Sequence, residues 1–108
     1  MKLTELVKYF REGNTFKDFC APRKLNADSE SISIAMSEPA TMDSELEFFE
    51  LEDTGGQMPF FRNGIAYYEL FDFHYFNDVI ISLEYGEWAS WSDERIARRL
   101  LNYGVYDA

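Results

Sequence analysis

The sequence predicts an α+β domain in which an N-terminal helix and two C-terminal helices cover a small, mostly antiparallel β-sheet. Apolar residues recur every three or four positions at both ends of the chain, which indicates amphipathic helices. In the middle, short alternating segments lie between Gly, Pro and Asn residues, which indicates strands joined by turns. The chain has 108 residues, 46% of them hydrophobic, so we expect one globular domain over residues 1–108.

The chain opens with a predicted helix that Gly13 can end, because glycine adopts the left-handed conformation common at helix ends. Residues 15–21 fit two structures. The spacing of Phe16 and Phe19, three positions apart, indicates a short helix. The β-branched and aromatic residues before Pro22 indicate a strand instead. We favour the strand. The apolar face of the first helix consists of Leu3, Leu6, Val7 and Phe10.

Three further segments predict strands. Residues 31–36 alternate cleanly, with Ile32, Ile34 and Met36 on one face. Residues 45–52 also alternate, but the phase changes at Phe48 and Phe49, where a β-bulge would return the apolar side chains to one face. A short helix is the alternative for that segment. Residues 65–71 have high β-propensity and follow the turn signal Asn63-Gly64.

Residues 73–83 change to a helical period, with Asp72 placed to cap the start and Gly86 placed to end the helix. A strand over residues 79–85 is the alternative.

The last predicted helix begins after Ser92, a favoured N-cap residue, and ends at Gly104. Glu94 and Arg98 are four positions apart on it, so we expect an ion pair worth about 0.3 kcal/mol.

Charge is distributed unevenly along the chain. Between Leu25 and Glu94 there are sixteen acidic residues and one base, Arg62, whereas both ends carry an excess of bases and the net charge is −10. A field of this sign attracts basic protein surfaces and repels nucleic-acid phosphates and anionic lipid headgroups. We therefore expect a protein partner, no direct binding of nucleic acid and no binding to membranes.

Catalytic and metal-binding motifs are missing from the sequence. His74 is the only histidine, and we interpret it as structural or solvent-facing. Cys20 stands between Phe19 and Ala21 and is interpreted as a small buried apolar residue. One Cys and one His cannot form the usual zinc frameworks, and the acidic run matches no calcium loop. We expect no catalytic residue, metal or cofactor. The lone cysteine and the absence of a secretory apolar run lead us to expect a cytoplasmic protein.

Acidic side chains interleaved with aromatic ones predict a surface that occupies a basic site on another protein. Trp88 and Trp91 precede the last helix and are candidate anchors, because tryptophan often dominates the binding energy of an interface. The residues predicted to bind the partner are Asp43, Glu45, Glu47, Glu50, Glu52, Asp53, Tyr68, Asp72, Glu87, Trp88 and Trp91.

In size, acidity and aromatic content the chain resembles bacterial immunity proteins of the contact-dependent growth inhibition type. The similarity extends to a layout: the opening MKLTELVKYFRE, a break at Pro59, the segment IAYYELFDF, an aliphatic helix and the closing SDERIARRLLNYGVYDA. The resemblance implies a non-enzymatic inhibitor. We expect a monomer or weak dimer, although the surplus of aromatic residues could also serve self-association. Its partner would be the C-terminal domain of a cognate toxin, a basic nuclease whose active-site or substrate-binding surface it blocks.

Two other functions stay open at this point. The same charge suits a nucleic-acid mimic that inhibits a DNA- or RNA-binding enzyme, provided its carboxylates have phosphate-like spacing. A small acid–base enzyme would need a concave pocket that holds carboxylates of raised pKa. Glu45 and Glu47 would lie about 7 Å apart on one strand face, as a paired acid and base could.

Overall fold

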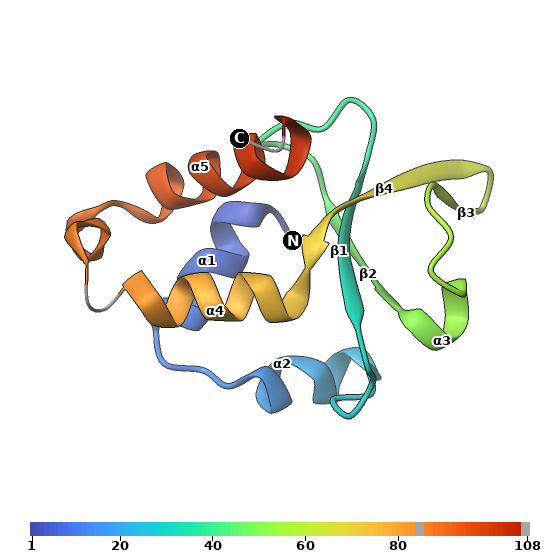
Figure 1. The fold of residues 1–108 in the computed structure, drawn as a ribbon, viewed down its shortest axis with the longest axis horizontal. Helices are drawn as coiled ribbons and strands as arrows, with labels where there is room; N and C mark the ends of the chain where they lie inside the picture. Colours follow the sequence, from blue (N-terminus) through green and yellow to red (C-terminus); the bar gives the residue numbers. More distant parts are fainter. Residues whose placement is uncertain (84–85, 107–108) are drawn as a thin grey trace.

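Four antiparallel strands form a curled sheet in the order β2-β1-β4-β3, and helices cover one of its faces (Figure 1). The computed structural model describes residues 1–83 and 86–106. Within the second range, the backbone of Glu87 is described but its side chain is not. The strands are β1 Ile32–Ser37, β2 Leu46–Glu50, β3 Phe60–Arg62 and β4 Ile65–Asp72. The helices are α1 Leu3–Arg11, α2 Phe16–Arg23, α3 Leu51–Thr54, α4 Phe73–Leu83, the 3-10 helix η1 Glu87–Ser90 and α5 Asp93–Tyr106. The predicted α+β class, with an N-terminal helix and two C-terminal helices, is confirmed.

The segment 15–21, predicted as a strand, belongs to a helix. Thr15 and Asp18 form a capping box: the Thr15 hydroxyl accepts from the Asp18 amide at 3.1 Å, and the Asp18 carboxylate accepts from the Thr15 amide at 3.3 Å. Pro22 lies in the last turn of α2, which ends one residue later, where Lys24 adopts a left-handed φ of 57°. The cap therefore outweighs the β-propensity of this segment.

The bulge expected at Phe48 and Phe49 lies elsewhere. Pairing of β1 with β2 is unbroken from Ile32↔Glu50 to Met36↔Leu46, and the chain then turns into α3, so the predicted strand stops before residue 51. The register shift occurs instead where β4 pairs with β1 between Ile34 and Ala35.

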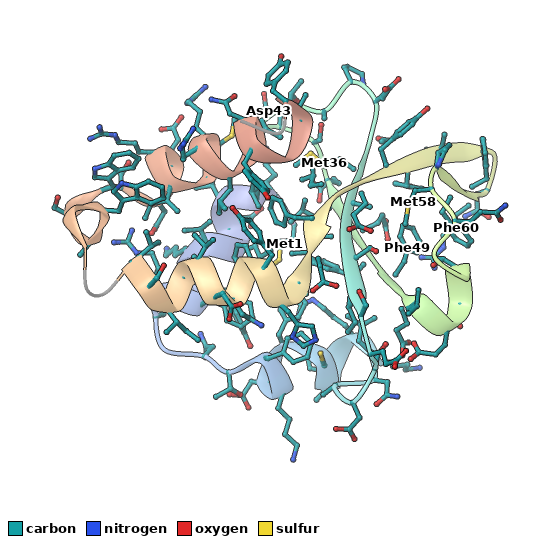
Figure 2. The ribbon with its side chains drawn as sticks, in the orientation of Figure 1. Met1, Met36, Asp43, Phe49, Met58 and Phe60 are labelled. Atoms are coloured by element: carbon teal, nitrogen blue, oxygen red, sulfur yellow. The ribbon has the colours of Figure 1, made fainter. Side chains whose placement is uncertain are left out.

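Phe49 is buried on the face of the sheet opposite to that of Phe48, because the sheet curls over it. The Phe49 ring lies 4.9 Å from Phe60 and 5.6 Å from Tyr67, measured between centroids. Figure 2 shows Phe49, Met58 and Phe60 gathered beneath the β3–β4 hairpin. This hairpin covers a second, smaller apolar cluster, which explains the change of phase in β2.

Strand β3 was not predicted, although its turn was. Asn63 and Gly64 have φ values of 52° and 78°, as the two central residues of a type I′ hairpin turn require. The strand itself has three residues, which pair from Phe60↔Tyr67 to Arg62↔Ile65.

Helices α4 and α5 confirm the predictions for the C-terminal part, apart from one end. Asp72 caps α4 by accepting from the His74 amide at 2.7 Å, and Ser92 caps α5 by accepting from the Arg95 amide at 3.1 Å. Gly104, however, does not end α5. The helix continues to Tyr106, because the glycine lets it lie against β4.

The main core lies between the sheet and the helices and is dominated by aromatic rings. Phe19 packs at 5.2 Å from Phe73 and 5.0 Å from Phe48, and Phe10 packs at 5.7 Å from Phe76. Such tilted and edge-on contacts favour a well-ordered core. Among the helices of the described ranges, none is both long and apolar enough to cross a membrane.

Candidate functional site

The net negative charge of the protein is carried by the part of the chain that forms the sheet. We call residues 25–72 the sheet segment, since they contain all four strands, α3 and the loops between them. The sheet segment has eleven acidic residues and one base, a net charge of −10. The remaining residues, 1–24 and 73–108, have nine acids and nine bases and are neutral together. The excess acidity therefore belongs to the part of the chain that contains the strands.

Two bases of the helical side, Arg11 and Arg98, are engaged in contacts among the helices. Arg11 pairs with Asp93 at 2.8 Å and donates to the carbonyl groups of Trp91 and Ala89 at 2.9 and 3.0 Å. Arg98 forms the predicted pair with Glu94 at 2.9 Å. These two contacts hold the helices together, whereas Lys2, Arg23 and Lys24 lie beside acids of the sheet segment.

Three of the eleven sheet-segment acids are in ion pairs. Glu45 accepts from the amino group of Met1, Asp43 lies 3.9 Å from Lys2, and Glu47 lies 3.6 Å from Arg62. The hydrogen bond and charge of the amino group lower the pKa of Glu45. Glu45 and Glu47 are thus each neutralised by a different base.

The other eight sheet-segment acids form no ion pair within the stretch 25–72, every residue of which is described. Four of these eight were among the predicted partner-binding residues: Glu50, Glu52, Asp53 and Asp72. The full set is Asp28, Glu30, Glu38, Glu50, Glu52, Asp53, Glu69 and Asp72.

Three serines hold acidic side chains of this set in place. Ser29 donates to Glu52 at 2.6 Å, Ser33 donates to Glu69 at 2.7 Å, and Ser31 donates to Asp72. The bond from the Ser29 hydroxyl is the main cause of a lowered pKa at Glu52, because it stabilises the charged form. These serines were not predicted as functional residues. The sequence signal that could have revealed them is the alternation around β1, in which these serines lie on the polar side, opposite Ile32 and Ile34.

Glu50 and Asp53 line a different place, a hollow of about 540 Å³ beside the edge strand β2. Arg23, Lys24 and Arg62 line the same hollow, so its charges are mixed. It therefore lacks the uniform negative charge that would favour a purely basic ligand.

The predicted tryptophan anchors lie away from the sheet. Trp88 and Trp91 are half-buried and stacked on each other, with ring centroids 5.0 Å apart. The guanidinium of Arg95 covers the ring of Trp91 at 3.6 Å. They sit in and after η1, at the far end of the helical side from the hairpin (Figure 1). The side chain of Glu87 lies outside the described residues.

Tyr68, in contrast, lies on β4 with 40% of its surface exposed, in the wall of a groove of about 590 Å³. The groove lies between β4, the end of β1 and the last turn of α5, and most of its lining is apolar. The predicted residues therefore occupy several separate places, not one surface.

Groups that could carry chemistry are placed as follows. His74 is exposed, and Cys20 is buried, so desolvation raises the pKa of its thiol. For Glu45 and Glu52 the pKa shift is downward, the opposite of what a general acid at neutral pH needs. In the described part of the chain, no three His, Cys, Asp or Glu side chains are grouped to hold a metal ion.

Comparisons with known proteins gave no relative: no family model matches the sequence, no curated protein is similar to it, and no solved structure matches its fold.

Proposed function

We propose that this chain is an immunity protein that binds the basic nuclease domain of a cognate toxin and covers its active-site or substrate-binding surface. The observation that carries the proposal is the confinement of the whole net charge of −10 to the sheet segment. The protein catalyses no reaction in this proposal, and acts by occupying the site that phosphates would otherwise reach.

The physical argument concerns eight carboxylates of the sheet segment that form no ion pair in the described fold. Like charges held on one side of a small domain repel one another and destabilise the free protein. A cationic partner removes that repulsion on binding, and its attraction speeds association. A nuclease supplies such a surface, because it needs Lys and Arg to bind phosphates.

Two matched double variants test the proposal. Glu30→Gln with Asp53→Asn removes two exposed charges from the sheet segment. Glu12→Gln with Asp78→Asn removes two exposed charges from the helical side. Each changes the net charge by two units, so a difference between them reports the location of charge and not its total.

The partner to be measured is the C-terminal domain of the protein encoded immediately upstream of this chain, which the proposal expects to be a toxin, co-expressed and purified with it. We expect a 1:1 complex that inhibits the nuclease and weakens as NaCl is raised. The sheet-segment double variant should bind roughly tenfold more weakly, and the helical-side variant within about threefold of the original. Failure of the original chain to bind that domain contradicts the proposal, as does equal weakening by both variants.

A competition experiment with the same protein distinguishes an immunity protein from a nucleic-acid mimic. If the chain competes with a DNA duplex for unrelated DNA-binding enzymes and ignores the neighbouring toxin domain, the mimic replaces the immunity protein as the better assignment.

A further inference from the structure

The groove beside Tyr68 is the place where the structure combines apolar surface with negative charge. The floor is formed by Met36 and Leu70, which belong to the core. Gly104 and Val105 in the last turn of α5 form one wall, and residues 38–40 after β1 form the other.

An apolar strip continues from this groove along the β3–β4 hairpin. Tyr68 pairs with Met36, so it lies on the helix-facing side of the sheet, and alternation puts Ala66 on the same side. Phe61 pairs with Ala66 and shares that side. The helices end at the groove, so Tyr68 and Phe61 stay 40% and 65% exposed.

Exposed apolar residues of the described chain are concentrated on the hairpin strip and the last turn of α5, and two of them, Tyr68 and Val105, line the groove. Six large hydrophobic residues are well exposed, and four of them are on the strip or in the last turn of α5: Phe61, Tyr68, Val105 and Tyr106. The other two, Ile65 and Ile81, lie on the opposite side of the hairpin and on α4. A gathering of this kind marks an interaction site more often than scattered apolar residues do.

The charge of the groove selects the kind of occupant. Glu38 and Glu69 are the charged residues that line it, and both are acidic. The Glu69 carboxylate accepts from Ser33 on the far face of the sheet, whereas the exposed Glu38 stands at the groove with no ion pair in the described part of the chain. A second copy of this chain would bring its own charge of −10 to the same place, and repulsion opposes that.

We infer that the groove and strip receive a segment of the toxin domain in which an apolar or aromatic side chain is flanked by Lys or Arg. This inference rests on the proposed function. The apolar side chain enters between Tyr68 and Val105, and the flanking cation pairs with Glu38. The contact would thus combine a buried anchor with charge complementarity.

Two matched pairs of variants test the location on the toxin complex. Phe61→Ser and its control Ile65→Ser alter opposite faces of one hairpin. Tyr68→Ser in the groove has Ile81→Ser on α4 as its control. We expect Phe61→Ser and Tyr68→Ser to raise the Kd roughly 30-fold, and their controls to change it by less than about threefold. Circular dichroism checks that each variant is folded. If the original chain binds the toxin but the controls lose as much affinity as the groove variants, this inference fails while the proposed function stands.

A second measurement does not depend on the toxin. The peptide acetyl-Lys-Trp-Lys-Phe-Lys-amide is titrated into ¹⁵N-labelled protein, with acetyl-Glu-Trp-Glu-Phe-Glu-amide as the control. We expect amide shifts confined to residues 36–38, 40, 61, 66–70 and 104–105, and only with the basic peptide. Shifts elsewhere, or none, overturn the inference.

Concentration-dependent shifts of the same amides without peptide would show self-association and overturn it as well. A groove response to the basic peptide without toxin binding would refute the proposed function, and with it the toxin as the occupant of the groove.

Discussion

Gly104 lets the last turn of α5 lie directly on β4. A Cβ atom at this position would stand 3.0 Å from Cβ, 3.1 Å from Cδ2 and 3.1 Å from the carbonyl oxygen of Leu70. The carbonyl oxygen belongs to a paired strand and cannot move aside cheaply. This close approach keeps the wall and the floor of the groove together.

Gly104→Ala is therefore expected to destabilise the protein although alanine favours a helix. The better helix propensity contributes about 1 kcal/mol, and overpacking costs about 1–3 kcal/mol, so we expect a net loss of up to ~2 kcal/mol in the free energy of unfolding in urea. Gly86→Ala is the control, because its nearest neighbour would be 4.0 Å away, and it should stay within about 0.5 kcal/mol. A more stable Gly104→Ala variant would contradict the packing argument.

Glu52 gives the protein a predictable response to acid. Its pKa is lowered below its ordinary value of 4.5, first by the Ser29 hydroxyl and then by backbone amides. A lowered pKa in the folded state means that the contribution to stability is complete above pH 4.5 and is lost as the pH falls through the folded pKa. Ser29→Ala should raise the NMR titration midpoint of the Glu52 carboxyl towards 4.5, whereas Ser31→Ala, which loses a bond to Asp72, should leave it unchanged. An unchanged midpoint in Ser29→Ala would show that another group holds the charge.

At the scale of elements, Arg11 joins the end of α1 to the start of α5. Arg11→Met should lower the free energy of unfolding by about 1.5–3 kcal/mol, because a charged bond to Asp93 and two bonds to carbonyls are lost. Arg98→Met removes a pair on the surface of one helix and should cost less than about 0.5 kcal/mol. Urea unfolding of the two variants measures the contrast, and equal losses would refute the joining role of Arg11.

The elements also show which parts of the fold could be predicted. Helices α1, α4 and α5 follow from spacing along the chain, because each buries a single apolar face whatever its neighbours are. Helix α2 depends on the cap between Thr15 and Asp18, a local signal that was readable but was given less weight than β-propensity. Strand β3 is too short to be stable alone and exists through pairing with β4.

Non-local contacts explain why the bulge and the candidate site were harder to predict. Phe49 turns to the outer face of the sheet because the hairpin curls over it, and nothing near Phe49 in the sequence encodes that cover. The acidity of the middle of the chain was evident from composition. Which carboxylates are neutralised was not, since Glu47 meets Arg62 and Asp43 meets Lys2 only in the folded chain.

At the scale of the whole molecule, the charge of the sheet segment should make stability depend on salt. Eight acids without ion pairs repel one another, and the Debye length falls from about 30 Å at 0.01 M to about 8 Å at 0.15 M ionic strength. We expect the free energy of unfolding in urea to rise over this range of NaCl. The Glu30→Gln, Asp53→Asn variant should show a smaller rise, and the Glu12→Gln, Asp78→Asn variant a rise close to that of the original. A stability independent of NaCl would mean that the carboxylates do not repel one another appreciably.

The net charge of the sheet segment, set against helical segments that are neutral together, also gives the protein an electric dipole directed from the sheet towards the helices. In solution, the field of an approaching cation exerts a torque on such a dipole, and the molecule turns its strands towards the cation before the two touch. With random orientation, most collisions would bring a surface other than the sheet against the partner. A rotation imposed at a distance shortens that search, and it does so without any flexible part.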